Sequence, residues 1–131
     1  MTPSTLNTLA NKIEVSVKSQ FVTQIIDNNK PLFVFSYTIT INNQSEQAVK
    51  LMSRYWLITD GEGEEVEVSG DGVIGEQPLI AAGASYQYSS GCHLSTPFGT
   101  MQGYYMMQTA NNQSIKVTIP LFQLAQPYCV N

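Results

Sequence analysis

The chain has 131 residues, of which 43% are hydrophobic and only 12% are charged, with a net charge of −4 at pH 7. This length predicts a single domain over residues 1–131, with enough apolar residues for a core that needs no disulfide. The six Lys and Arg residues form no run. We therefore predict no nucleic-acid partner, because phosphate-driven binding needs a basic face.

Residues 1–11 are polar and predict a flexible N-terminal lead-in. They lack the charged and apolar regions of a signal peptide, and no apolar run in the chain reaches the roughly 20 residues that cross a bilayer. These features predict a cytoplasmic protein without membrane insertion. Cys92 and Cys129 have no zinc-type spacing and would be free thiols by default, although their separation in space stays open.

Apolar and polar residues alternate with a period of two along most of the remaining chain. The longest such segment is residues 33–41, and shorter ones are residues 13–17 and 115–121. Trp56 stands within another strand-like segment and is a candidate core residue. Turn-forming residues separate about seven predicted strands, which favours two packed antiparallel sheets, with a small barrel as the alternative.

Three glycines, Gly70, Gly72 and Gly75, match the G-x-G-x-x-G pattern of dinucleotide-binding folds. In those folds the motif opens a helix, whose amino-terminal amides hold a pyrophosphate. Here Pro78 and a strand-like segment, residues 79–81, follow the glycines instead. The pattern therefore favours a structural loop, because glycines also serve tight turns and bulges.

The glycines lie among six carboxylates: Glu62, Glu64, Glu65, Glu67, Asp71 and Glu76. These charges would repel a free diphosphate. A Mg²⁺ or Ca²⁺ site is one interpretation, but Glu65 and Glu67 alternate with two valines, which favours the solvated face of a strand. An anion site on loop amides stays open, with Arg54 or Lys50 as its basic support.

Cys92 and His93 form the one place where a thiol and an imidazole are adjacent in the sequence. Neighbouring strand residues point in opposite directions, which argues against both a shared metal site and a Cys–His nucleophile. The chain has one His and no recognisable serine triad or carboxylate pair. We predict no enzyme, no catalytic residue, no metal site and no cofactor.

Residues 90–105 are rich in turn-forming, aromatic and thioether side chains. Strand alternation places Tyr104 on one face, and Met101 and Tyr105 on the other. One face would fill the core while the other exposes apolar surface for a partner, and core packing of both faces is the alternative. The candidate interaction surface comprises Pro78, Pro97, Phe98, Met101 and Tyr104.

Residues 54–60, 70–78 and 89–103 together resemble the ApaG family (ApaG/CorD-like domain), with GDGVIGEQP and LSTPFGTMQG as the most specific motifs. The resemblance covers residues 12–124. It implies an immunoglobulin-like or fibronectin type III-like β-sandwich without established enzymatic activity, associated with cobalt resistance and magnesium efflux. It also implies a protein-binding role. The family's glycine motif, which has been interpreted as a pyrophosphate site, corresponds to Gly70, Gly72 and Gly75.

Together these features predict a non-enzymatic protein–protein interaction module. Its partner would be an unidentified protein, and a homodimer is also open. The alternative function is a pyrophosphate- or nucleotide-binding protein that uses the glycines.

Overall fold

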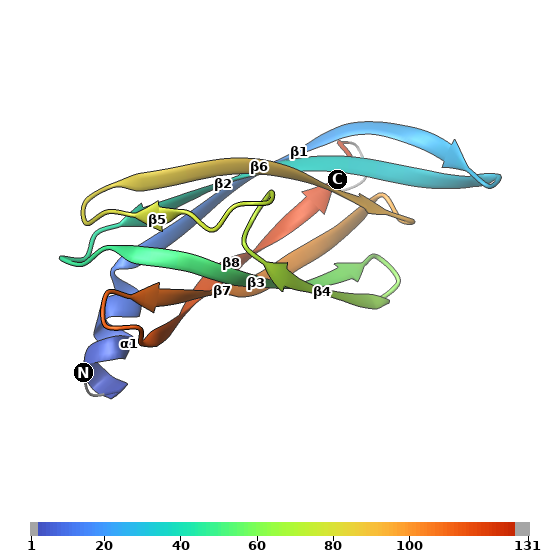
Figure 1. The fold of residues 1–131 in the computed structure, drawn as a ribbon. Helices are drawn as coiled ribbons and strands as arrows, with labels where there is room; N and C mark the ends of the chain where they lie inside the picture. The colour runs from blue at the N-terminus through green and yellow to red at the C-terminus, as the bar shows by residue number, and fades with distance from the viewer. Residues whose placement is uncertain (1–2, 128–131) are drawn as a thin grey trace.

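The computed structural model describes residues 3–127, which form two antiparallel sheets and one helix (Figure 1). The strands are β1 (Ile13–Asp27), β2 (Lys30–Asn43), β3 (Val49–Asp60), β4 (Glu65–Asp71), β5 (Leu79–Ile80), β6 (Ser85–Leu94), β7 (Phe98–Thr109) and β8 (Ser114–Ala125). A sheet in the order β1-β2-β6 packs against a sheet in the order β4-β3-β7-β8, and β5 pairs with β3. The predicted β-sandwich, of the immunoglobulin-like and fibronectin type III-like kind, is confirmed, and the barrel alternative is wrong.

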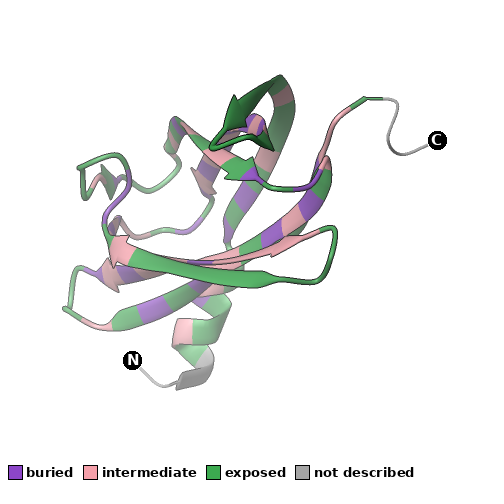
Figure 2. Ribbon diagram, turned by 90° about the vertical axis from the view of Figure 1, so that its right-hand side faces the viewer, coloured by how far each residue is buried: buried purple, intermediate pink, exposed green. Residues whose placement is uncertain are grey.

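The core lies between the inner faces of the two sheets, and the colours in Figure 2 alternate along the strands that supply it. The alternation in residues 33–41 is confirmed, because every second side chain from Phe33 to Ile41 is buried. Trp56 and Tyr105 complete the core from the opposite sheet, with 3% and 0% exposure. Period-two patterning therefore identified both inner faces where strands are regular.

The alternation predicted for residues 115–121 fails at its last residue. The three earlier apolar residues are buried, but Leu121 is 57% exposed. The register between β7 and β8 shifts at this point and leaves Pro120 and Leu121 without partners. Such a bulge reverses the faces of the side chains that follow, so Leu124 is buried in place of Leu121.

Helix α1 (Pro3–Asn11) occupies the segment where the sequence predicts a flexible lead-in, so that prediction is wrong for these residues. Leu9 is buried in the core, and Leu6 packs against it. The spacing of these two leucines, three residues apart, places them on one helical face. Met1 and Thr2 lie outside the described residues, and within residues 3–127 no helix is long and apolar enough to cross a membrane.

The two flanks of the sandwich differ. On one flank β1 lies beside β8, and the Ser19 hydroxyl donates a hydrogen bond of 2.8 Å to the Gln123 carbonyl. On the other flank the outer strands are β4 and β6. Within the part of the chain that the structure describes, β4 pairs only with β3 and β6 only with β2. We call the first the closed flank and the second the open flank.

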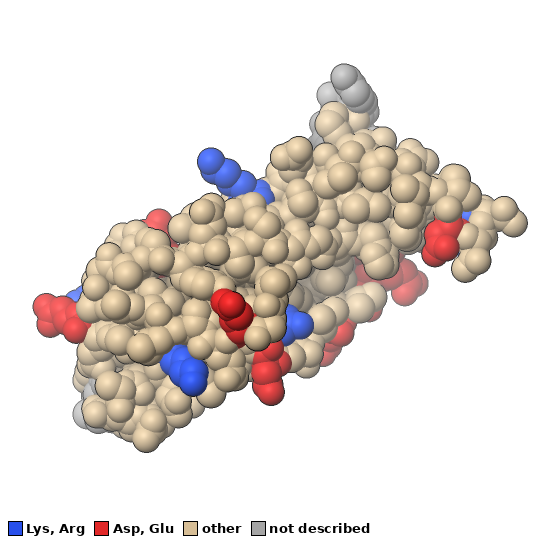
Figure 3. Space-filling view, turned by 45° about the horizontal axis from the view of Figure 1, so that its top comes forward, with Lys and Arg blue, Asp and Glu red and all other residues tan. Residues whose placement is uncertain are grey.

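Charge is sparse on the surface and unevenly distributed. Residues 55–115 contain no Lys or Arg, and the carboxylates of residues 60–71 belong to the end of β3, the following turn and β4. In Figure 3 several acidic groups follow the lower right edge of the molecule, where Figure 1 places this turn. The open flank is therefore bordered by negative charge.

Candidate functional site

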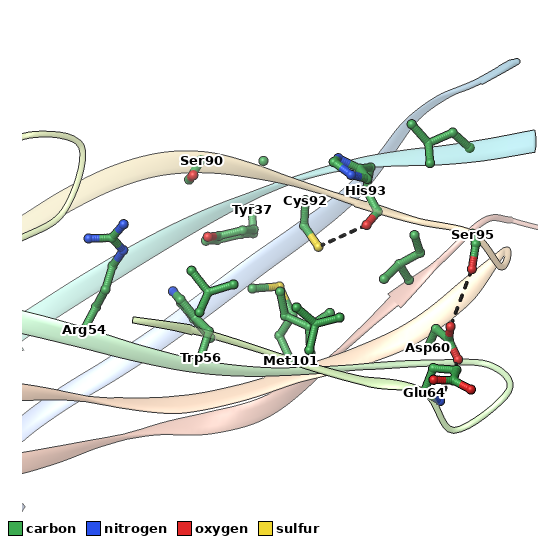
Figure 4. A pocket seen from close by; sticks show the side chains of 16 residues that line it. Tyr37, Arg54, Trp56, Asp60, Glu64, Ser90, Cys92, His93, Ser95 and Met101 are labelled. Carbon is green, nitrogen blue, oxygen red and sulfur yellow. Dashed lines mark hydrogen bonds between the residues drawn. The ribbon is translucent and has the colours of Figure 1, made fainter. Parts of the chain in front are cut away.

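A cavity of about 520 Å³ opens between β4 and β6 on the open flank (Figure 4). We call it the flank groove. It follows β3 from Arg54 to Asp60, a length of roughly 20 Å for extended backbone. Its lining is mainly apolar and includes Trp56, Ile58, Val66, Val68, Leu94 and Met101.

The register between β3 and β4 places two valines in this groove. Val68 is paired with Trp56, and Val66 is paired with Ile58, so the four side chains share the inner face. Because no further strand of the described chain covers β4, Val66 is 57% exposed and Val68 is 37% exposed. The groove therefore presents apolar surface that the fold itself leaves unburied.

Hydrogen bonds between two turns close one end of the groove. The Gly61 amide donates to the Thr96 hydroxyl at 2.8 Å. The Ser95 hydroxyl donates to Asp60 Oδ2 at 3.5 Å, as Figure 4 shows. These bonds connect the turn after β3 to the turn after β6, and they place a carboxylate at this end.

The other end of the groove is occupied by the Arg54 guanidinium. Its Nη1 donates to the carbonyl oxygens of Asp71 and Gly72, at 3.1 Å and 2.9 Å. The Tyr86 hydroxyl donates to Glu76 Oε2 at 3.2 Å, which connects the glycine loop to β6. The groove thus has a basic end and an acidic end with an apolar middle.

The glycine loop, residues 70–76, is a tight turn, and no helix follows it. Ile74 and Gly75 have φ angles of 48° and 76°, a pair of left-handed residues of the kind found in two-residue hairpin turns. Gly72 permits a close backbone approach, because a Cβ there would lie 2.2 Å from the Glu76 carbonyl oxygen. Turn geometry thus accounts for two of the three glycines.

Arg54 approaches the glycines, as the anion interpretation requires. A Cβ at Gly70 would lie 3.0 Å from Arg54 Nη1, so the missing side chain makes room for the guanidinium. However, the amides of Gly72, Val73 and Glu76 all donate to backbone carbonyls. A dinucleotide-binding loop instead aims its amides at the phosphate.

A second cavity, of about 230 Å³, lies between the glycine loop and buried aromatic side chains. Tyr88 and Tyr105 share a hydrogen bond between their hydroxyl groups, and Tyr37 lines the same cavity. Burial raises the pKa of all three phenols above the ordinary value. Neutral hydroxyl groups therefore underlie the Arg54 end of the groove.

Cys92 and His93 both line the groove, but the His93 side chain is exposed and Figure 4 shows its ring pointing away from the Cys92 thiol. The Cys92 thiol donates to the His93 carbonyl at 3.8 Å. Burial raises the pKa of Cys92 to about 11, so the thiol stays protonated at neutral pH. Among residues 3–127 no three His, Cys, Asp or Glu side chains form a metal-binding group, and Cys129 lies outside the described residues.

The residues of the predicted interaction surface do not form one patch. Met101 is 1% exposed and lies in the groove lining. Tyr104 stacks on a neighbouring tyrosine at 4.9 Å on the outer sheet face. The Pro78 carbonyl accepts a backbone hydrogen bond near the start of β3. Pro97 and Phe98 lie past the end of β3, roughly 30 Å from Pro78 along the strand. The five residues therefore lie in separate places in the fold, and their role in partner binding stays a prediction.

Val66 and Val68 were missed as site residues. Their alternation with Glu65 and Glu67 predicted a strand with one covered face and one solvated face. The pattern cannot show that β4 is an outer strand whose inner face lacks a neighbour. The long segment without Lys or Arg, residues 55–115, was the available signal for an unusual surface.

The ApaG domain family matches residues 24–109 of the chain. Protein ApaG of Proteus mirabilis is 44% identical over 122 residues, covering 93% of this chain and 98% of that protein. Protein ApaG of Sinorhizobium fredii is 48% identical over 119 residues, covering 91% and 92% respectively. These matches extend over nearly the full length of both relatives.

Solved structures share the same architecture. An X-ray structure from the Northeast Structural Genomics Consortium has a TM-score of 0.91 at 44% identity, covering 94% of this chain and 93% of that one. A crystal structure of a protein from Bordetella pertussis has a TM-score of 0.82 at 42% identity, covering 88% and 94%. In sequence and in fold, this chain belongs to the ApaG domain family.

Proposed function

We propose that this protein is a non-enzymatic binding module that takes a segment of a partner protein into the flank groove. The observation that supports this most strongly is an apolar groove between two strands with free edges. Free strand edges accept extended segments by backbone pairing, and apolar pockets beside them provide selectivity.

The exposed valines supply part of the binding energy. Covering Val66 and Val68, which are 57% and 37% exposed, would contribute about 1 kcal/mol each. The polar ends at Arg54 and Asp60 would fix the register of the bound segment, because a misplaced segment would leave one of these charges unpaired.

The chemistry of the groove supports binding without catalysis. Cys92 is protonated at neutral pH because burial raises the pKa of its thiol to about 11, and His93 faces away from it. Effects on cobalt resistance and magnesium efflux, which the family resemblance implies, would then follow from the partner that is bound. They would not require metal ligands from this chain.

Site-specific crosslinking in cells tests the proposal. The photo-reactive residue p-benzoylphenylalanine replaces Val66 in the groove or, as a matched control, Val22 on β1, which is 53% exposed. We expect a discrete protein adduct at Val66 only. Excess wild-type chain should compete for that adduct, whereas excess Val68→Trp chain, whose groove is filled, should not. Adducts that persist under wild-type competition, or that form equally at Val22, would contradict the proposal.

The alternative function is nucleotide or pyrophosphate binding, and the position of Arg54 beside Gly70 favours it. An NMR titration of the labelled chain with pyrophosphate and ATP, with and without Mg²⁺, follows the amides of Gly70, Gly72 and Gly75. Under the leading proposal these amides do not shift at millimolar ligand. Saturable shifts at micromolar ligand would make the phosphate site the primary function.

A further inference from the structure

We infer that the groove's occupant is an extended segment, in which apolar and basic residues alternate, that adds as a strand to the free edge of β4. This inference rests on the proposed function and specifies the chemistry of the partner. It combines three features of β4: an unpaired edge, an apolar inner face and an acidic outer face.

The edge of β4 is open to pairing. Among the described residues its only strand partner is β3, and of its seven residues only Gly70 is even half-buried. The strand contains neither Lys nor Pro, which commonly protect strand edges from pairing. Its backbone can therefore accept another strand.

The two faces of β4 define the pattern of an added strand. Val66 and Val68 face the groove, while Glu65 and Glu67 are exposed and paired in register with Thr59 and Leu57. Side chains of an added strand alternate in the same way. Its inward side chains would cover the valines, and its outward side chains would lie beside the glutamates.

The outer face selects for positive charge. The carboxylates of residues 60–71 lie at or next to β4, residues 55–115 contain no Lys or Arg, and the Arg54 guanidinium is bonded only near the Asp71 end of the strand. Opposite charges on neighbouring strands stabilise pairing, and like charges oppose it. A negative border also accelerates encounter with a basic segment.

A second copy of this chain does not fit the pattern. Its strands β1, β2 and β8 carry one Lys each, so none alternates apolar with basic residues. Two copies of β4 would place Glu65 and Glu67 near their equivalents and repel each other. The partner is therefore another protein, with about six extended residues to span the roughly 20 Å groove.

Peptide titrations of the labelled full chain test the inference. The probe is the acetylated and amidated peptide KVKIKVK, and its controls are EVEIEVE, with reversed charge, and KKVIVKK, with the same composition and no alternation. We expect KVKIKVK to bind saturably, to shift the amides of residues 65–69, and to slow their hydrogen exchange through new backbone bonds. Binding should weaken as salt rises.

A charge-swap variant provides the matched control. Glu65→Lys combined with Glu67→Lys should weaken binding of KVKIKVK about tenfold, as expected for two exposed ion pairs, and should create binding of EVEIEVE. The Val68→Trp variant should lose binding of KVKIKVK because the groove is filled. Thermal unfolding of both variants verifies that they fold.

Three outcomes would overturn the inference. Equal binding of KVKIKVK and EVEIEVE in the groove would exclude charge selection and leave the proposed function intact. Equal binding of KVKIKVK and KKVIVKK without slowed exchange would indicate charge attraction alone. An absence of binding at millimolar peptide would also refute it, and the crosslinking at Val66 would then decide the proposed function independently.

Discussion

The closed and open flanks are built from similar strands but differ in what covers them. Val15 on β1 and Val66 on β4 each follow a glutamate in an alternating strand. Val15 is 8% exposed and belongs to the core, whereas Val66 is 57% exposed. On the closed flank β8 and α1 lie beside β1, while among residues 3–127 the inner face of β4 lines the flank groove and no strand covers it.

This difference shows that the same local pattern can supply either core or exposed apolar surface. The closed flank stabilises the fold, because its apolar residues are removed from water by neighbouring elements. The open flank retains similar residues in contact with water. A bound partner would remove this apolar surface from water. Substitutions on the two flanks should therefore affect different properties.

The largest expected contrast comes from placing a charge on each flank. Val15→Lys should destabilise the fold by about 3 kcal/mol or more, because it buries an unpaired ammonium group. Val66→Lys should change stability by less than about 0.5 kcal/mol, because its side chain reaches water. Urea unfolding of both variants measures the contrast, and equal destabilisation would contradict the assignment of an open flank.

Thiol reactivity measures the environment inside the groove. In a Cys129→Ser background, Cys92 should react with iodoacetamide at pH 8 about 100-fold more slowly than an exposed thiol, because burial raises its pKa from 9.0 to about 11. The control thiol is Val22→Cys combined with Cys92→Ser. The alkylation rate of Cys92 should still rise between pH 9 and 11, where the rate of the control thiol levels off. The same dependence of both rates on pH would exclude a raised pKa of Cys92.

Alkaline pH should weaken the region behind the open flank. Burial holds the pKa of Cys92, Tyr88 and Tyr105 above their unfolded values, so their contribution to stability is complete below about pH 9. Above that pH the unfolded chain ionises first, and each group should cost up to about 1.4 kcal/mol per pH unit.

Urea unfolding between pH 8 and 11 measures this loss. Tyr88→Phe combined with Tyr105→Phe removes both phenols and leaves neither hydroxyl without its partner. The double variant should lose stability less steeply than the wild-type chain as pH rises. An identical pH dependence in the two proteins would contradict the role of the buried phenols.

The architecture could be predicted from the sequence because the alternation in residues 33–41 is a local property of regular strands. Leu121 was misplaced because a bulge reverses the alternation, and its position depends on pairing with another strand. Helix α1 was missed because two leucines in a polar segment gave a weak pattern, although their packing on the core stabilises the helix.

The candidate site could be predicted only in part. The glycines were correctly expected to form a loop without a helix, because Pro78 and a strand follow them. The flank groove could not be predicted, since Val66 and Cys92 come from different sheets. Their proximity depends on the packing of β4 opposite β6, which no local pattern specifies.

Partner binding in the flank groove is tested most directly by the affinity of the partner captured at Val66 for purified wild-type, Val68→Trp and Val22→Trp chains. If the partner binds in the flank groove, Val68→Trp should weaken binding by at least about tenfold, as expected for a change at the centre of an interface. The Val22→Trp control should bind like the wild-type chain. Equal affinity of all three chains would contradict the flank groove as the binding site.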